Sequence, residues 1–193
     1  MNLELLRSKA KLGDIILIGG SGWLSWLIGF GQKTQTPDGK ASKWSHVALY
    51  VDSYTVWEST IDFKPYPAVD GKRLDNGVQF NLLGDYKDTK PACLLHFPFN
   101  DEQREKLITE MEEMKKKGYT YPILGLVGSL LSYWIFRWKS NPLQTKHSLY
   151  CSAAVQEVYR VLDIDFDPLH TARNTSPQAI ANYNMEGLEK ILL

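Results

Sequence analysis

The chain has 193 residues, 44% of them hydrophobic, which is enough for one well-packed domain and short for two. Lys plus Arg and Asp plus Glu each number 22, so the formal net charge is zero. This balance argues against a nucleic-acid-binding protein, because such domains normally have a basic face. Two cysteines are too few for a disulfide framework, and with four dispersed histidines they lack the spacing of a zinc site. We therefore expect one domain over residues 1–193, with no metal, no other cofactor and no nucleic-acid partner.

Residues 1–14 are informative about the cellular location of the protein. They contain no apolar stretch of signal-peptide length, so we predict no secretion signal. The expectation is a cytoplasmic protein in a reducing environment, where a thiol stays free.

The first half of the chain contains short segments bounded by Gly, Pro and Asp, a pattern that predicts strands joined by turns. Five such strands are expected at 14–18, 46–51, 55–60, 77–83 and 92–99. The second and third are separated by a tight turn at 52–54, which predicts a hairpin. Between the first two, residues 21–32 predict a short helix with four apolar side chains on one side: Trp23, Trp26, Leu27 and Phe30.

The clearest helix is predicted over residues 101–117. Asn100 can cap its start, acidic residues suit its first turn and lysines its last, and Gly118 can end it. Its apolar positions Leu107, Met111 and Met114 form a single face, so we expect the helix to lie on a sheet.

The most apolar run extends from Tyr121 to Phe136. It falls just short of the roughly 18 residues that suggest a membrane-spanning helix, and Pro122 and two glycines interrupt it. We favour a buried or interfacial helix here, so membrane contact is open but not favoured.

Two further helices are expected in the last third of the chain. One runs to Leu162 from a start near Cys151, and the other begins after a cap at Thr175 or Ser176, with Pro177 at its first position. Strands therefore precede a helical C-terminal half without βαβ alternation, which predicts an α+β fold with an antiparallel sheet packed against helices.

Cys151 is a candidate nucleophile. It recurs with Val155, Val158 and Leu162 on one helical face, which should carry the sulfur toward the core. A thiol in the first turn of a helix lies where unpaired N–H groups and the helix dipole favour the thiolate. The alternative is a buried structural cysteine, the commonest role of a free cysteine.

His46 and Glu58 are candidate partners for that thiol. A cysteine nucleophile needs a base in reach and a third group that orients the base. If the predicted hairpin forms, Glu58 falls roughly opposite Ala48 or His46, where a carboxylate can hold one imidazole nitrogen. The plainer alternatives are a surface histidine and a solvated strand glutamate.

The other histidines and the second cysteine compare poorly with this set. His147 precedes Cys151 by four residues in a predicted loop, and His170 lies in an irregular segment. His96 follows Cys93 by three residues, on the opposite face of a strand, so Cys93 is predicted to be a core residue.

The order of these segments resembles the permuted papain-like branch of the NlpC-type cysteine peptidase superfamily, a permutation shared by lecithin:retinol acyltransferase-like proteins. The resemblance rests on GDIILIGG, WSHVALYVD, VWEST, GYTYPILGL, YCSAAVQEVYRVL and TSPQAIAN, in which the histidine strand precedes the cysteine helix. It implies a circularly permuted papain-like fold and a catalytic triad of Cys151, His46 and Glu58. Trp44, Tyr121 and Tyr150 flank the motifs and are candidate substrate-binding walls of a cleft, with aromatic packing as the alternative.

The expected activity is that of a thiol hydrolase that forms an acyl-enzyme, most simply a cysteine peptidase or amidase. The resemblance implies an amide bond of a peptidoglycan-type peptide, or a related small amide, as substrate. A lipid-directed acyltransferase or thioesterase is the alternative suggested by the apolar run from Tyr121. A non-catalytic binding module on the same fold is the third. The partner is thus a small peptide, amide or acyl compound, and the oligomeric state is open.

Overall fold

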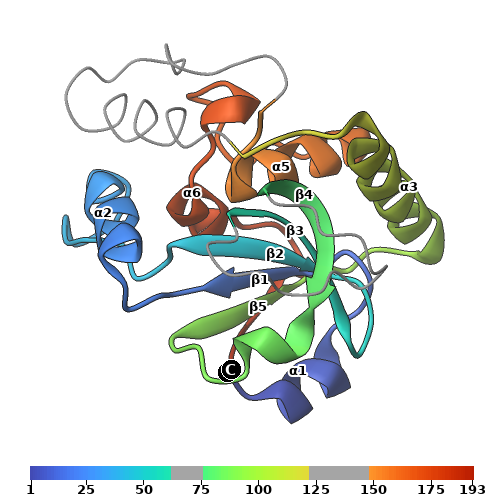
Figure 1. Ribbon diagram of the computed structural model, residues 1–193, viewed down its shortest axis with the longest axis horizontal. Coiled ribbons are helices and arrows are strands. Elements are labelled where there is room, and N and C mark those ends of the chain that lie inside the picture. The colour runs from blue at the N-terminus through green and yellow to red at the C-terminus, as the bar shows by residue number, and fades with distance from the viewer. Residues whose placement is uncertain (62–75, 122–147) are drawn as a thin grey trace.

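The computed structural model describes residues 1–61, 76–121 and 148–193, and a six-stranded antiparallel sheet dominates them (Figure 1). The spatial order of the strands is β4-β3-β2-β1-β5-β6. Their bounds are β1 Ile15–Ile18, β2 His46–Tyr50, β3 Thr55–Ile61, β4 Asn76–Leu82, β5 Ala92–His96 and β6 Glu189–Leu192. The α+β fold class is confirmed.

Helices cover both faces of this sheet. Their bounds are α1 Leu3–Lys9, α2 Trp23–Gly31, α3 Asp101–Lys117, α5 Cys151–Tyr159 and α6 Pro177–Asn182, with 3-10 turns at Leu83–Tyr86, Arg160–Leu162 and Ala172–Asn174. Figure 1 shows α3, α5 and α6 on one side of the sheet and α1 on the other. The sheet therefore has a separate hydrophobic core on each of its two faces.

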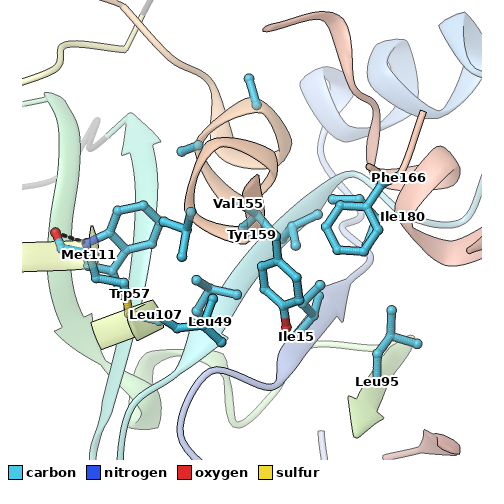
Figure 2. Close-up of a cluster of buried hydrophobic side chains, with 14 of the residues drawn as sticks. Ile15, Leu49, Trp57, Leu95, Leu107, Met111, Val155, Tyr159, Phe166 and Ile180 are labelled. Carbon is cyan, nitrogen blue, oxygen red and sulfur yellow. Dashed lines mark hydrogen bonds between the residues drawn. The ribbon is translucent and has the colours of Figure 1, made fainter. Parts of the chain in front are cut away.

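Strand alternation divides the apolar side chains between these two cores. Leu49 and Trp57 face α3 and α5 in the larger core, whereas Ala48 and Val56 face the smaller core beside α1. Figure 2 shows the larger core, in which the Trp57 indole donates a hydrogen bond to the Met111 carbonyl of α3 at 3.1 Å. Because successive strand residues point to opposite faces, one register fixes both cores.

The hairpin between β2 and β3 has the predicted register. Leu49 pairs with Trp57 and Tyr50 with Val56, around the expected turn. Glu58 follows Trp57, so its side chain lies on the opposite face from the indole, the face to which Ala48 also points.

The predicted signals of α3 are also confirmed. Asn100 and Gln103 form a reciprocal capping box, and Gly118 ends the helix in the left-handed conformation with φ 65°. Leu107, Met111 and Met114 are buried. These terminal signals are local, which is why the sequence alone locates both ends of the helix.

Some boundaries differ from the prediction. The helix that begins at Cys151 ends at Tyr159 and continues as a 3-10 turn to Leu162, so the predicted α-helix was three residues too long. The alternative caps at the C-terminal helix resolve to Ser176, whose side chain accepts from the Ala179 N–H at 3.0 Å. Helix α1 and strand β6 were not predicted. Residues 122–136 of the predicted apolar helix lie outside the described residues, and so does His147.

Candidate active site

His46 is the first residue of β2, directly opposite Ile18 of β1. The backbone before it is also fixed, because the Ser45 N–H donates to the Ile18 carbonyl at 2.9 Å. The imidazole is 19% exposed, so it lies at the end of the strand with one side open to solvent. A sheet position of this kind holds the ring on a rigid element rather than on a loop.

Glu58 contacts the Nε2 nitrogen of His46 through a short hydrogen bond. The carboxylate is fully buried and accepts two more hydrogen bonds, from the Asn81 amide at 2.6 Å and from the Tyr86 hydroxyl at 2.6 Å. The Tyr86 ring also stacks with the imidazole, with 6.1 Å between ring centroids. Neutral donors therefore satisfy the carboxylate on the sides that His46 does not occupy.

Cys151 is the first residue of α5, and Tyr150 is the N-cap. Two side-chain hydrogen bonds anchor this helix start: the Ser59 hydroxyl donates to the Leu149 carbonyl at 2.5 Å, and the Ser152 hydroxyl donates to the Thr175 carbonyl at 2.7 Å. Backbone N–H groups in the first turn of a helix have no intrahelical acceptor, and they favour negative charge at this position. The residue is only 3% exposed, so the sulfur faces the interior as predicted.

The electrostatics of His46 join these residues into one site. Burial alone would lower the pKa of His46, but the negative charges of Cys151 and Glu58, and the hydrogen bonds to both, raise it to about 10. Since Nε2 is engaged by Glu58, Nδ1 is the nitrogen left for the thiol. The arrangement favours the protonated form of the His46 imidazole.

The neighbouring acids and phenols respond to the same charges. Burial would raise the pKa of Glu58, but the charge of His46 and the hydrogen bonds from His46, Asn81 and Tyr86 lower it below its usual range. The pKa of Tyr121 is raised well above its ordinary value by burial and by the charges of Cys151, Tyr150 and Glu58. Tyr121 thus remains a neutral phenol close to the sulfur.

The three predicted aromatic walls divide into two groups. Trp44 and Tyr150 are 5% and 3% exposed and belong to the larger core, whereas Tyr121 is half-buried and packs against that core. Trp44 and Tyr150 are thus packing residues of the core, and their role in substrate binding stays a prediction. Asn81 and Tyr86, which hold Glu58, were not predicted.

A cavity of about 620 Å³ opens beside His46. Its lining includes Gly20, Ser25, His46, Tyr86 and Lys90. These groups are small or polar, so the cavity suits a polar group next to the imidazole.

Within residues 1–61, 76–121 and 148–193, no three His, Cys, Asp or Glu side chains are grouped closely enough to hold a metal ion. No protein-family model matches the chain, and no curated protein matches it significantly.

Proposed function

We propose that this chain is a thiol hydrolase in which Cys151 is the nucleophile, His46 the acid and base, and Glu58 the group that orients His46. The observation that supports this most strongly is the hydrogen bond between His46 Nε2 and the fully buried Glu58, with Cys151 as the second neighbour that raises the pKa of the same imidazole. A surface histidine or a solvated glutamate would not have these neighbours. Nucleophile, base and orienting acid are the three parts that thiol catalysis requires.

The proposed reaction has two steps. The Cys151 sulfur attacks a carbonyl carbon, forming an S–C bond while the C=O electrons move to oxygen. The backbone N–H at the start of α5 stabilises that oxyanion, and the C–N bond breaks as His46 gives its proton to the leaving nitrogen. In the second step, water attacks the thioester carbonyl, His46 takes the proton, and breaking the C–S bond restores the thiolate.

Glu58 acts through the imidazole and not on the substrate. Its hydrogen bond to Nε2 fixes the ring and leaves Nδ1 available to the sulfur, and its negative charge stabilises the imidazolium. Asn81 and Tyr86 hold the carboxylate in this position.

We further propose that the fold is the circularly permuted papain-like arrangement. In support, the strand that provides the histidine precedes the helix that provides the cysteine, and that helix packs on the sheet. The proposed substrate is an amide bond in a peptidoglycan-type peptide or a related small amide. Among the site residues, His46 and Tyr86 line the cavity described above, and its mainly small and polar lining would suit a polar part of such a substrate beside the imidazole.

Alkylation by iodoacetamide near neutral pH tests the nucleophile. Cys93 is a matched control, because it is the other free cysteine and is also buried. Burial raises the pKa of Cys93, although Lys43 and Lys190 act in the opposite direction, so it should react slowly. We expect Cys151→Ser to abolish fast labelling and Cys93→Ser to leave it unchanged. Equal labelling rates at the two cysteines, both no faster than a free thiol, would contradict the proposal.

A further inference from the structure

Helix α2 exposes its apolar side to solvent. The side chains of Trp23, Trp26 and Leu27 are 74%, 61% and 37% exposed. With Phe30 they lie on one side of the helix, as their spacing predicts, and the rings of Trp26 and Phe30 stack with 5.4 Å between centroids. We call Trp23, Trp26 and Leu27 the α2 apolar face.

The opposite side of α2 is packed against the protein by backbone and polar contacts. The Ser42 N–H donates to the Gly29 carbonyl at 2.8 Å, and a Cβ at Gly29 would lie only 2.4 Å from the Ser42 carbonyl oxygen. The Gln32 amide donates to the carbonyls of Ile28 and Trp44. The close approach of Gly29 to Ser42 leaves no room for a larger residue. Together with the hydrogen bond from Gln32 to Trp44, it fixes which side of α2 faces the protein.

This orientation is the reverse of an ordinary surface helix, which buries its apolar stripe. Large side chains that form an exposed apolar patch often mark a protein or membrane interaction site. The packing of Gly29 and Gln32 excludes a rotation that would bury Trp23 and Trp26 against the sheet. Trp23 and Trp26 are thus open to a partner from outside the chain.

A cation next to the α2 apolar face indicates the chemistry of that partner. In the chain, α2 is followed by three lysines, Lys33, Lys40 and Lys43, and one acid, Asp38, which pairs with Lys40. The Lys33 ammonium lies 4.7 Å from the centre of the Phe30 ring, at the C-terminal end of the same side. Tryptophan side chains at the headgroup level and lysines beside them are typical of helices that lie on anionic bilayers.

We propose that the α2 apolar face docks on the surface of an anionic lipid membrane, with Trp23 and Trp26 inserted at the headgroup level. No helix in the described part of the chain has the length and apolar content needed to cross a bilayer. In Figure 1, α2 lies at the periphery of the molecule, as such a contact requires. Ser25 of α2 lines the cavity beside His46, so docking brings that cavity next to the lipid.

Co-sedimentation of the full chain with vesicles tests this proposal. Vesicles of phosphatidylcholine alone are compared with vesicles that also contain phosphatidylglycerol. We expect binding to the anionic vesicles, weakened by salt, and a loss of about tenfold for each of Trp23→Ala and Trp26→Ala, because each removes a large buried apolar contact. Both side chains are exposed, so the variants should fold.

Tyr54→Ala is the matched control. Tyr54 is 72% exposed and lies in the turn after β2, at the other end of the strand from His46. This variant should bind vesicles as tightly as the parent. Cys151→Ser should do so too, which would show that membrane docking does not depend on the proposed catalysis.

Two results would overturn the proposal. One is vesicle binding that is absent, or that is unchanged in Trp23→Ala and Trp26→Ala. The other is self-association in size-exclusion chromatography that Trp26→Ala abolishes while the parent ignores vesicles, which would assign the face to a second copy of the chain.

Discussion

Two carboxylates that are fully buried in the described part of the chain each hold a histidine, yet their surroundings differ. Glu58 bonds to His46 and Asp14 bonds to His96, and both carboxylates are fully buried while the two imidazoles are 19% and 20% exposed. By these measures alone the two pairs are equivalent.

The partners around each pair separate them. Asp14 also contacts the Arg104 guanidinium at 3.2 Å and accepts from the Phe97 N–H at 3.2 Å and the Lys11 N–H at 2.9 Å. It therefore ties the loop before β1 to the end of β5 and to α3. Glu58 has two neutral donors, and its histidine meets the sulfur of Cys151. A histidine–carboxylate pair thus becomes a candidate site only when a nucleophile faces the other imidazole nitrogen.

The largest expected effect is on stability, from Asp14→Ala. This change leaves the buried Arg104 without its anion and removes acceptors for two backbone N–H groups. We expect the free energy of unfolding to fall by about 3–5 kcal/mol, measured by urea denaturation. Glu58→Ala leaves two neutral donors and an imidazole that, unlike Arg104, can lose its proton and is partly exposed, so it should lose only about 1–3 kcal/mol. Equal losses would mean that the two carboxylates play the same structural role.

The second effect is on thiol reactivity. His46→Ala should slow alkylation of Cys151 at pH 7 about 30-fold, because an ordinary cysteine is only a few per cent thiolate at that pH. His96→Ala should change the rate by less than about twofold, since that histidine belongs to the structural pair. Mass spectrometry of the labelled peptides measures both rates, and a comparable drop in His96→Ala would break the distinction.

The third effect is a pH dependence of stability. The pKa of His46 is raised to about 10, so its stabilising contribution is complete below the unfolded value of about 6.5 and is lost as the pH rises through about 10. Relative to His46→Gln, the free energy of unfolding of the parent should fall by about 1–2 kcal/mol between these limits. This is less than the full pKa difference would give, because solvent screens the partly exposed ring. Urea titrations at several pH values measure this. A difference that stays constant with pH would exclude a persistent imidazolium.

The smallest effect concerns the groups behind Glu58. Tyr86→Phe removes one donor to the carboxylate and keeps the ring that stacks on His46. We expect a loss of about 1 kcal/mol in stability and about a fivefold slower alkylation of Cys151. Tyr54→Phe is the control for an exposed hydroxyl. Unchanged alkylation in Tyr86→Phe would show that Asn81 alone positions Glu58.

Much of the fold was predictable because its signals are local. Glycine and proline bound the strands, the register of the hairpin follows from its turn, and Asn100 and Gly118 end α3. The positions of Cys151, His46 and Glu58 came from helix start and strand alternation, and they do lie together. Their roles in catalysis stay a prediction.

Other features were beyond sequence reasoning because they depend on distant contacts. Asn81 and Tyr86 are 23 and 28 residues from Glu58, and polar residues near a strand end look solvated in a sequence. Strand β6 has only four residues and forms by pairing with β5. Periodicity placed Trp23 and Trp26 on one side of α2 but did not indicate that this side faces outward.

The position of β1 at the interior of the sheet has a consequence for local unfolding. β1 is paired on both sides, with β2 and β5, whereas β4 is an edge strand of the sheet. Amide hydrogen exchange normally proceeds from the least stable units, so β4 should open before β1 and β2 do. Such an opening would free Asn81 from Glu58 while His46 stays paired opposite Ile18. Fluctuations of the sheet edge would therefore widen the range of imidazole orientations, while the His46 backbone stays in place.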